Sequence, residues 1–127
     1  MSYANQAAAA SAAYRTSQQL DQRPAAVLAA VHQELASVVN SAIAAYRRRA
    51  LDEMCRHNAR AVHLLWGLMA ALDGHSPETG RLVEGYARLR DAINRVFVDS
   101  NEINTLEAGV EWLRQLTRNF LNELRAA

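Results

Sequence analysis

Four segments of this chain repeat their apolar residues at steps of three and four, which is the spacing of one face of an α-helix. This periodicity limits the fold most, because a half-buried strand would instead alternate apolar and polar residues. Five Gly and two Pro among 127 residues leave little material for turns. Long amphipathic helices with short connections bury their stripes most simply in an antiparallel bundle. The sequence therefore predicts an all-α fold, an antiparallel four-helix bundle.

The first three expected helices cover residues 24–46, about 51–72 and 77 to near 99, and the fourth starts at the 99–102 segment and runs to 124. Each has an inward seam of apolar residues, with two polar exceptions, Asn58 and Thr117. In chain order the seams are Val27, Val31, Leu35, Val38, Ala42 and Tyr46; Leu51, Met54, Asn58, Ala61, Leu65, Leu68 and Leu72; Leu82, Tyr86, Leu89, Ile93 and Val96 or Phe97; and Ile103, Leu106, Val110, Leu113, Thr117, Phe120 and Leu124.

Local signals mark the ends of these helices. Pro24 and Pro77 suit the first helical position, where a missing N–H costs nothing, and Ser76 suits the N-cap before Pro77. Gly74 is the expected stop of the second helix. Asp99 and Glu102 have the D-x-x-E form of a capping box, in which Glu102 would reach back to the cap N–H.

Residues 1–23 are rich in Ala and Gln and lack a deep apolar stripe, so we expect a mobile arm or short helix before a single domain at 24–127. The opening residues carry no positively charged region of a signal peptide, and no stretch approaches the roughly 20 apolar residues of a membrane span. One cysteine, Cys55, cannot form an internal disulfide. These features predict a cytoplasmic protein without membrane insertion.

Little in the sequence indicates catalysis. Fourteen basic residues nearly balance thirteen acidic ones, so the net charge of +1 does not favour nucleic-acid binding. No two of the four histidines have the i, i+4 spacing that would place two metal ligands on one helix face. We therefore expect a buried Cys55, solvated histidines, and no metal or cofactor. No P-loop, G-x-S-x-G or G-x-G-x-x-G motif is present, so an enzyme is not expected.

The second and fourth helices carry more apolar residues than one seam needs. Val62, Trp66 and Met69 form a second row on one helix, and Trp112 and Leu116 form a second row on the other. Two interpretations stay open. Either these helices are covered on two sides, or part of the second row lines a groove that accepts an amphipathic helix.

The order of several motifs resembles the FliS flagellin-export chaperones over about residues 14–124. Tyr14 precedes Pro24, and the residues between them are rich in Gln, Thr and Ser. Residues 61–73 (AVHLLWGLMAALD) are similar to the family's second helix. Residues 95–101 (RVFVDSN) are similar to the segment that closes the family's third helix. The chain departs from the family at residues 31–34 (VHQE), where members have a Leu-Tyr-Asp-Gly step. It also lacks the family's Tyr-Asp-Tyr cluster. The resemblance is therefore to a divergent member.

The resemblance implies a chaperone that binds the disordered C-terminal region of flagellin, prevents premature polymerisation and helps to deliver it to the flagellar export gate. Two alternatives stay open: another secretion helper, such as a FlaF-like regulator of flagellin synthesis, and a self-assembling bundle whose second rows form a homo-oligomer interface. The predicted partner-binding residues are Tyr14, Val27, Leu28, Val31, Leu35, Val62, Leu65 and Trp66.

Overall fold

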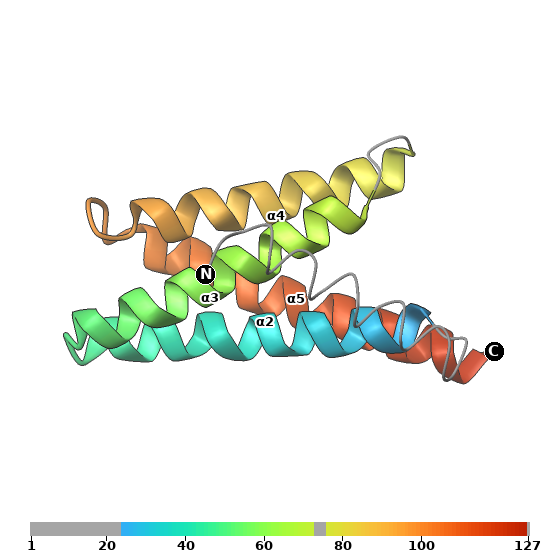
Figure 1. The fold of residues 1–127 in the computed structure, drawn as a ribbon, viewed down its shortest axis with the longest axis horizontal. Helices are drawn as coiled ribbons and strands as arrows, with labels where there is room; N and C mark the ends of the chain where they lie inside the picture. Colours follow the sequence, from blue (N-terminus) through green and yellow to red (C-terminus); the bar gives the residue numbers. More distant parts are fainter. Residues whose placement is uncertain (1–23, 73–75, 127) are drawn as a thin grey trace.

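The computed structural model describes residues 24–72 and 76–126. These residues form four helices: α2 (Pro24–Arg47), α3 (Leu51–Ala71), α4 (Pro77–Arg95) and α5 (Glu102–Ala126). Consecutive helices run in opposite directions in Figure 1, which confirms the predicted all-α, antiparallel four-helix bundle. The expected arm at 1–23 and the expected stop at Gly74 lie outside the described residues.

The turn between α2 and α3 is closed by a left-handed residue. Arg49 has a φ of 59° and follows the last turn of α2. Its N–H donates to the carbonyl of Tyr46, and the N–H of Ala50 donates to the carbonyl of Ala45 over 2.9 Å. This pair of bonds is the Schellman motif, in which glycine is the usual left-handed residue. Here the left-handed residue is an arginine, for which this backbone conformation is less favourable than for glycine.

The start of α4 matches the sequence, whereas the start of α5 does not. Ser76 is the N-cap of α4, and its hydroxyl accepts a bond from the N–H of Thr79. At α5, the carboxylate of Asp99 accepts a bond from the N–H of Asn101. The helix therefore begins at Glu102 itself, three residues after Asp99. The predicted capping box, which would put Glu102 in the third position of the helix, is wrong.

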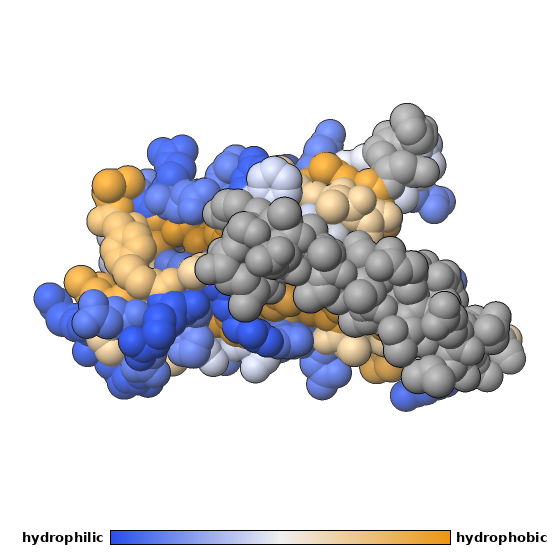
Figure 2. Space-filling model, in the orientation of Figure 1, coloured by the Kyte–Doolittle hydropathy of each residue, from blue (hydrophilic) through white to orange (hydrophobic). Residues whose placement is uncertain are grey.

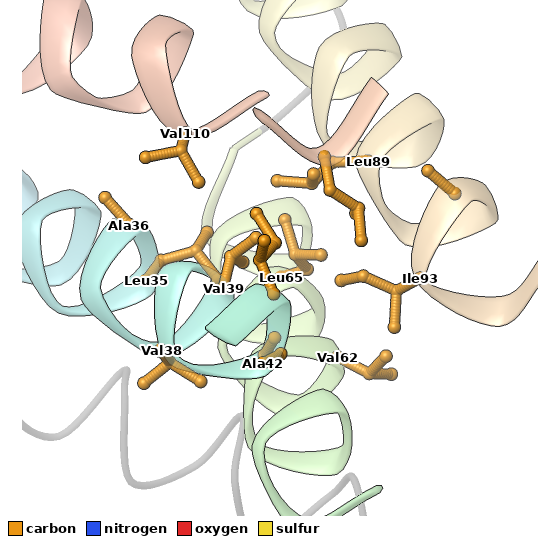
Figure 3. Packing of buried hydrophobic residues seen from close by; sticks show 14 of the residues in the cluster. Leu35, Ala36, Val38, Val39, Ala42, Val62, Leu65, Leu89, Ile93 and Val110 are labelled. Carbon is orange, nitrogen blue, oxygen red and sulfur yellow. The ribbon is translucent and has the colours of Figure 1, made fainter. Parts of the chain in front are cut away.

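The helices form a ring in which α2 packs most closely against α5 and α3, while α4 touches α3 and α5 less extensively. Figure 3 shows Leu35 and Val39 of α2 pointing toward Leu65 of α3, with Ile93 of α4 beyond them. The core draws on all four helices. Its fully buried large side chains are Tyr86, Leu35, Met54, Leu65, Leu106, Leu113, His32, Val39 and Val96.

Helix α2 is also long and apolar enough, over Ala25–Arg47, to satisfy the length and composition of a membrane span. The expectation that no stretch approaches a span is therefore wrong by this criterion. In the bundle, 44% of the most apolar window of this helix is buried. Core helices of soluble proteins pass the same test, because a helix covered on two sides is apolar around most of its circumference.

Candidate functional site

The predicted partner-binding residues of α2 lie in or beside the core. Leu35 is fully buried, and Val27 is buried as well. Leu28 and Val31 are partly buried and pack against the core cluster. Tyr14 lies outside the described residues.

The three predicted residues of α3 fall into different surroundings. Leu65 is fully buried in the same cluster as Leu35. Val62 is 7% exposed and lines a hollow shared with α4, whereas Trp66 is 43% exposed. Met69, in the same second row, packs partly buried against the core. The second apolar row of α3 therefore differs in exposure along its length: Val62 and Met69 are buried or partly buried, and Trp66 is exposed.

The hollow beside Val62 is the feature best suited to a partner. It has a volume of about 270 Å³ and lies between α3 and the C-terminal end of α4. We call it the α3–α4 groove. Val62 and Ile93 are its buried apolar residues, and Phe97, 50% exposed, stands at its rim. The residues that line the groove are Cys55, Asn58, Ala59, Val62, His63, Ile93, Asn94 and Phe97.

Further apolar side chains are exposed near this end of the bundle. Leu51 is 50% exposed and is the first residue of α3, and Val98 is 86% exposed and lies in the turn that follows α4. The start of α3 and this turn are at the same end in Figure 1, and Figure 2 shows apolar surface there. Trp66 lies on the same face of α3 as Cys55 and Ala59, because steps of four and seven residues return to one helix face.

Asn58 lies at the groove with no hydrogen-bond partner for either amide atom. The residue is 7% exposed, and both its side-chain nitrogen and oxygen are buried. An unpaired buried polar group costs about 1–3 kcal/mol of folding free energy, so native proteins seldom keep one without a role. The sequence did contain a signal for this residue, because Asn58 interrupts an otherwise apolar seam.

A second hollow, of about 360 Å³, lies between α4 and α5. Two glycines let the helices approach there. A Cβ on Gly85 would lie 2.3 Å from the ring of Trp112, and one on Gly109 would lie 2.7 Å from Leu89. Trp112 is only partly buried and packs against the core cluster. Its place in the surplus row of the fourth helix is therefore explained by packing on α4.

A buried polar pair connects α2 with α4. The imidazole Nε2 of His32 lies 2.5 Å from the hydroxyl of Tyr86, and its Nδ1 lies 2.6 Å from the carbonyl of Leu28. A carbonyl can only accept, so Nδ1 carries a proton and donates it. Burial lowers the pKa of His32, although the bond to Leu28 partly opposes this, and burial raises the pKa of Tyr86. The neutral ring therefore accepts at Nε2 from the tyrosine hydroxyl.

These positions correct two sequence expectations. His32 was expected to be solvated, but it is fully buried because Tyr86 and the aromatic ring of Phe120, 5.1 Å away between centroids, enclose it. Cys55 was expected to be buried, but it is exposed on the groove side of α3. Over residues 24–72 and 76–126, no group of three or more His, Cys, Asp or Glu side chains is placed to hold a metal ion.

No protein-family model, curated protein or solved structure matches this sequence. The resemblance to the flagellin-export chaperones therefore stays an expectation from the motifs.

Proposed function

We propose that this protein is a cytoplasmic flagellin-export chaperone, which binds the disordered C-terminal helical region of flagellin and prevents its premature polymerisation. It thereby assists type III flagellar secretion. The observation that carries the proposal is the α3–α4 groove, an apolar hollow with a half-exposed Phe97 at its rim. The identity of the client comes from the order of motifs over residues 14–124.

The physical basis of the activity is coupled folding and binding. A segment that buries an apolar face only in the assembled filament has no partner for that face as a monomer, and a groove on a helical bundle can supply a substitute. Ordering such a segment costs about 2–5 kcal/mol, which keeps the complex reversible. Reversible binding suits a chaperone that must release its client for export.

The remaining elements of the proposal come from the resemblance. A cytoplasmic location is consistent with the packing of α2 between α3 and α5 in the bundle. Delivery to the flagellar export gate, and a role for Tyr14 in the binding of the client, are expected from the family. Neither depends on the geometry of the groove.

A filament-assembly assay tests the function. Flagellin monomers are mixed with the purified protein, and filament growth is followed by light scattering. The wild-type protein is expected to suppress growth in proportion to its molar ratio to flagellin. Unimpeded growth at a molar excess of the protein would contradict the proposal.

In the same assay, Trp66→Ala is expected to weaken suppression by about tenfold or more. Exposed tryptophans are typical binding hot spots, and Trp66 shares a face of α3 with the groove residues Cys55 and Ala59. Since the side chain is 43% exposed, the loss of unfolding free energy should stay below the about 3–5 kcal/mol typical of a buried aromatic residue. Leu121→Ala is the matched control, because Leu121 is similarly exposed but lies on α5. Equal effects of the two variants would argue against the groove.

A further inference from the structure

A third hollow, of about 400 Å³, lies between α2 and α5. These two helices pack together more closely than any other pair in the bundle, and they run antiparallel (Figure 1). The α3–α4 groove is on the opposite side of the ring. The residues that line this α2–α5 hollow are Gln33, Ala36, Ser37, Asn40, Arg114, Thr117, Arg118 and Leu121. They include two arginines and several amide or hydroxyl groups, but no carboxylate.

One end of the α2–α5 hollow is positively charged. The salt bridge between Arg47 and Glu107 sets the register of the two helices, which have the same rise per residue. Continued along α2 and α5, this register places Asn40 opposite Arg114. Arg118 follows one turn further along the same face of α5. Two guanidinium groups and the amide of Asn40 therefore line the same end.

The other end of the hollow is uncharged. The same register places Gln33 opposite Leu121, whose side chain is 39% exposed. Ser37 lies between the two ends, one turn from Gln33 on α2. This end therefore offers one amide, one hydroxyl and an apolar wall.

The carboxylates of the neighbouring turns do not line the hollow, and each is paired with an arginine. Glu34 is the only acidic residue of α2, and it pairs with Arg60 of α3. Glu107 is held in the salt bridge that sets the register. Glu111 pairs with Arg118 over 3.3 Å, and its side chain is 67% exposed. The positive end of the hollow is therefore not neutralised from within.

The fold leaves donors unused at this end. Arg114 makes no hydrogen bond or ion pair with residues 24–72 or 76–126. The two hydrogen bonds of Arg118, to Glu111 and Gln115, both use Nη2. A guanidinium has five N–H donors, so Nε and Nη1 of Arg118 can still donate. The amide of Asn40 likewise has no partner in the described part of the chain.

A phosphate group matches these donors better than a carboxylate does. A phosphomonoester carries a charge of about −1.5 to −2 at pH 7 and three acceptor oxygens, which suit two guanidinium groups and an amide. A carboxylate offers one charge and two oxygens. The hollow is far larger than a phosphate and reaches the size of a small-molecule pocket, which begins at about 300 Å³. Its uncharged end has room for the body of an organic phosphate.

We propose that the α2–α5 hollow binds a small phosphomonoester. The phosphate accepts hydrogen bonds from Arg114, Arg118 and the amide of Asn40. The uncharged polar body lies against Gln33 and Leu121. The ligand contacts both helices, so it also stabilises the fold by binding only the folded state. The inference does not depend on the proposed function, because the hollow and the α3–α4 groove are on opposite sides of the ring.

Nuclear magnetic resonance of the full-length protein tests the site, with glycerol phosphate as the probe. Saturable chemical-shift changes are expected at the side-chain amides of both Gln33 and Asn40, and glycerol alone should cause none. The absence of saturable changes at these two amides would overturn the inference. Inorganic phosphate should bind more weakly and shift Asn40 alone, because it lacks the body. Equal affinity for the two phosphates would overturn the assignment of an organic phosphate and indicate free phosphate instead.

Two variants test the role of the charged end. Arg114→Gln and Asn40→Asp should each weaken glycerol phosphate binding by about tenfold or more, since one removes a guanidinium and the other adds a negative charge of the same shape. Both residues are exposed, so both variants should melt near the temperature of the wild type. Arg81→Gln is the matched control, because Arg81 is also exposed but lines the hollow between α4 and α5 together with Glu84. An equal loss in this control would show nonspecific attraction and overturn the inference.

Discussion

His32 and Tyr86 connect two helices that lie on opposite sides of the ring. Their backbones do not approach each other, so the connection depends on two long side chains that meet inside the bundle. The hydroxyl–imidazole bond satisfies one polar group from each helix, and Phe120 packs against the imidazole from α5. This pair gives the interior a directional contact that apolar packing alone does not provide.

This pair predicts a pH dependence of stability. Burial lowers the pKa of His32 in the folded protein below its ordinary value of 6.5, which the unfolded chain retains. The unfolded state therefore binds more protons below that value, and the unfolding free energy falls as the pH drops from 6.5 toward the folded pKa. The steepest slope from one such group is about 1.4 kcal/mol per pH unit.

Urea denaturation between pH 7 and pH 5 (about the window in which an ordinary histidine titrates) measures this slope. His32→Gln, which cannot titrate, should lose less stability over the same window than the wild type. His57 and His63 are present in both proteins and cancel in the comparison. Identical slopes for the two proteins would show that His32 does not stay neutral in the fold.

Among the helices, α4 is the one whose packing depends most on a close steric fit with its neighbour. It packs less extensively than α2 does, and its approach to α5 relies on Gly85 beneath the ring of Trp112. A methyl group there would force the indole or the helix to move. The same helix offers a comparison at Gly80, where a Cβ would meet nothing within 4 Å.

These glycines predict opposite effects of the same substitution. Gly85→Ala should lower the unfolding free energy by about 1–2 kcal/mol, because the overlap outweighs the gain in helix propensity. Gly80→Ala should raise it by about 0.5–1 kcal/mol, because only the propensity changes. Chemical denaturation measures both. A stabilised Gly85→Ala protein would mean that α4 and α5 are not held together at this point.

Helix positions were largely predictable from the sequence, because periodicity and capping are local properties. The starts at Pro24 and Pro77 and the cap at Ser76 follow from nearest neighbours in the chain. The start of α5 was misplaced because Asp99 bonds to the N–H two residues ahead instead of entering a capping box. Both interactions use the same carboxylate, and the sequence does not distinguish them.

At the scale of the whole molecule, the bundle could be predicted but its grooves could not. A stripe on one helix does not reveal which neighbour covers it, so Leu65 and Trp66 were assigned one role although one is fully buried and the other reaches the surface. The same limit hid the burial of His32 and the exposure of Cys55. Asn58 was visible in the sequence as a polar residue in an apolar seam, but that its amide is buried without a partner became evident only from its neighbours.

Titration calorimetry against the C-terminal segment of a flagellin from the same cell shows whether the bundle binds a flagellin segment, as we claim. We expect saturable binding near one-to-one, with a clearly negative heat-capacity change, because an apolar face is buried in the groove. Absence of binding heat at several temperatures with every flagellin segment would contradict the claim. Concentration-dependent light scattering of the protein alone would then indicate self-assembly instead.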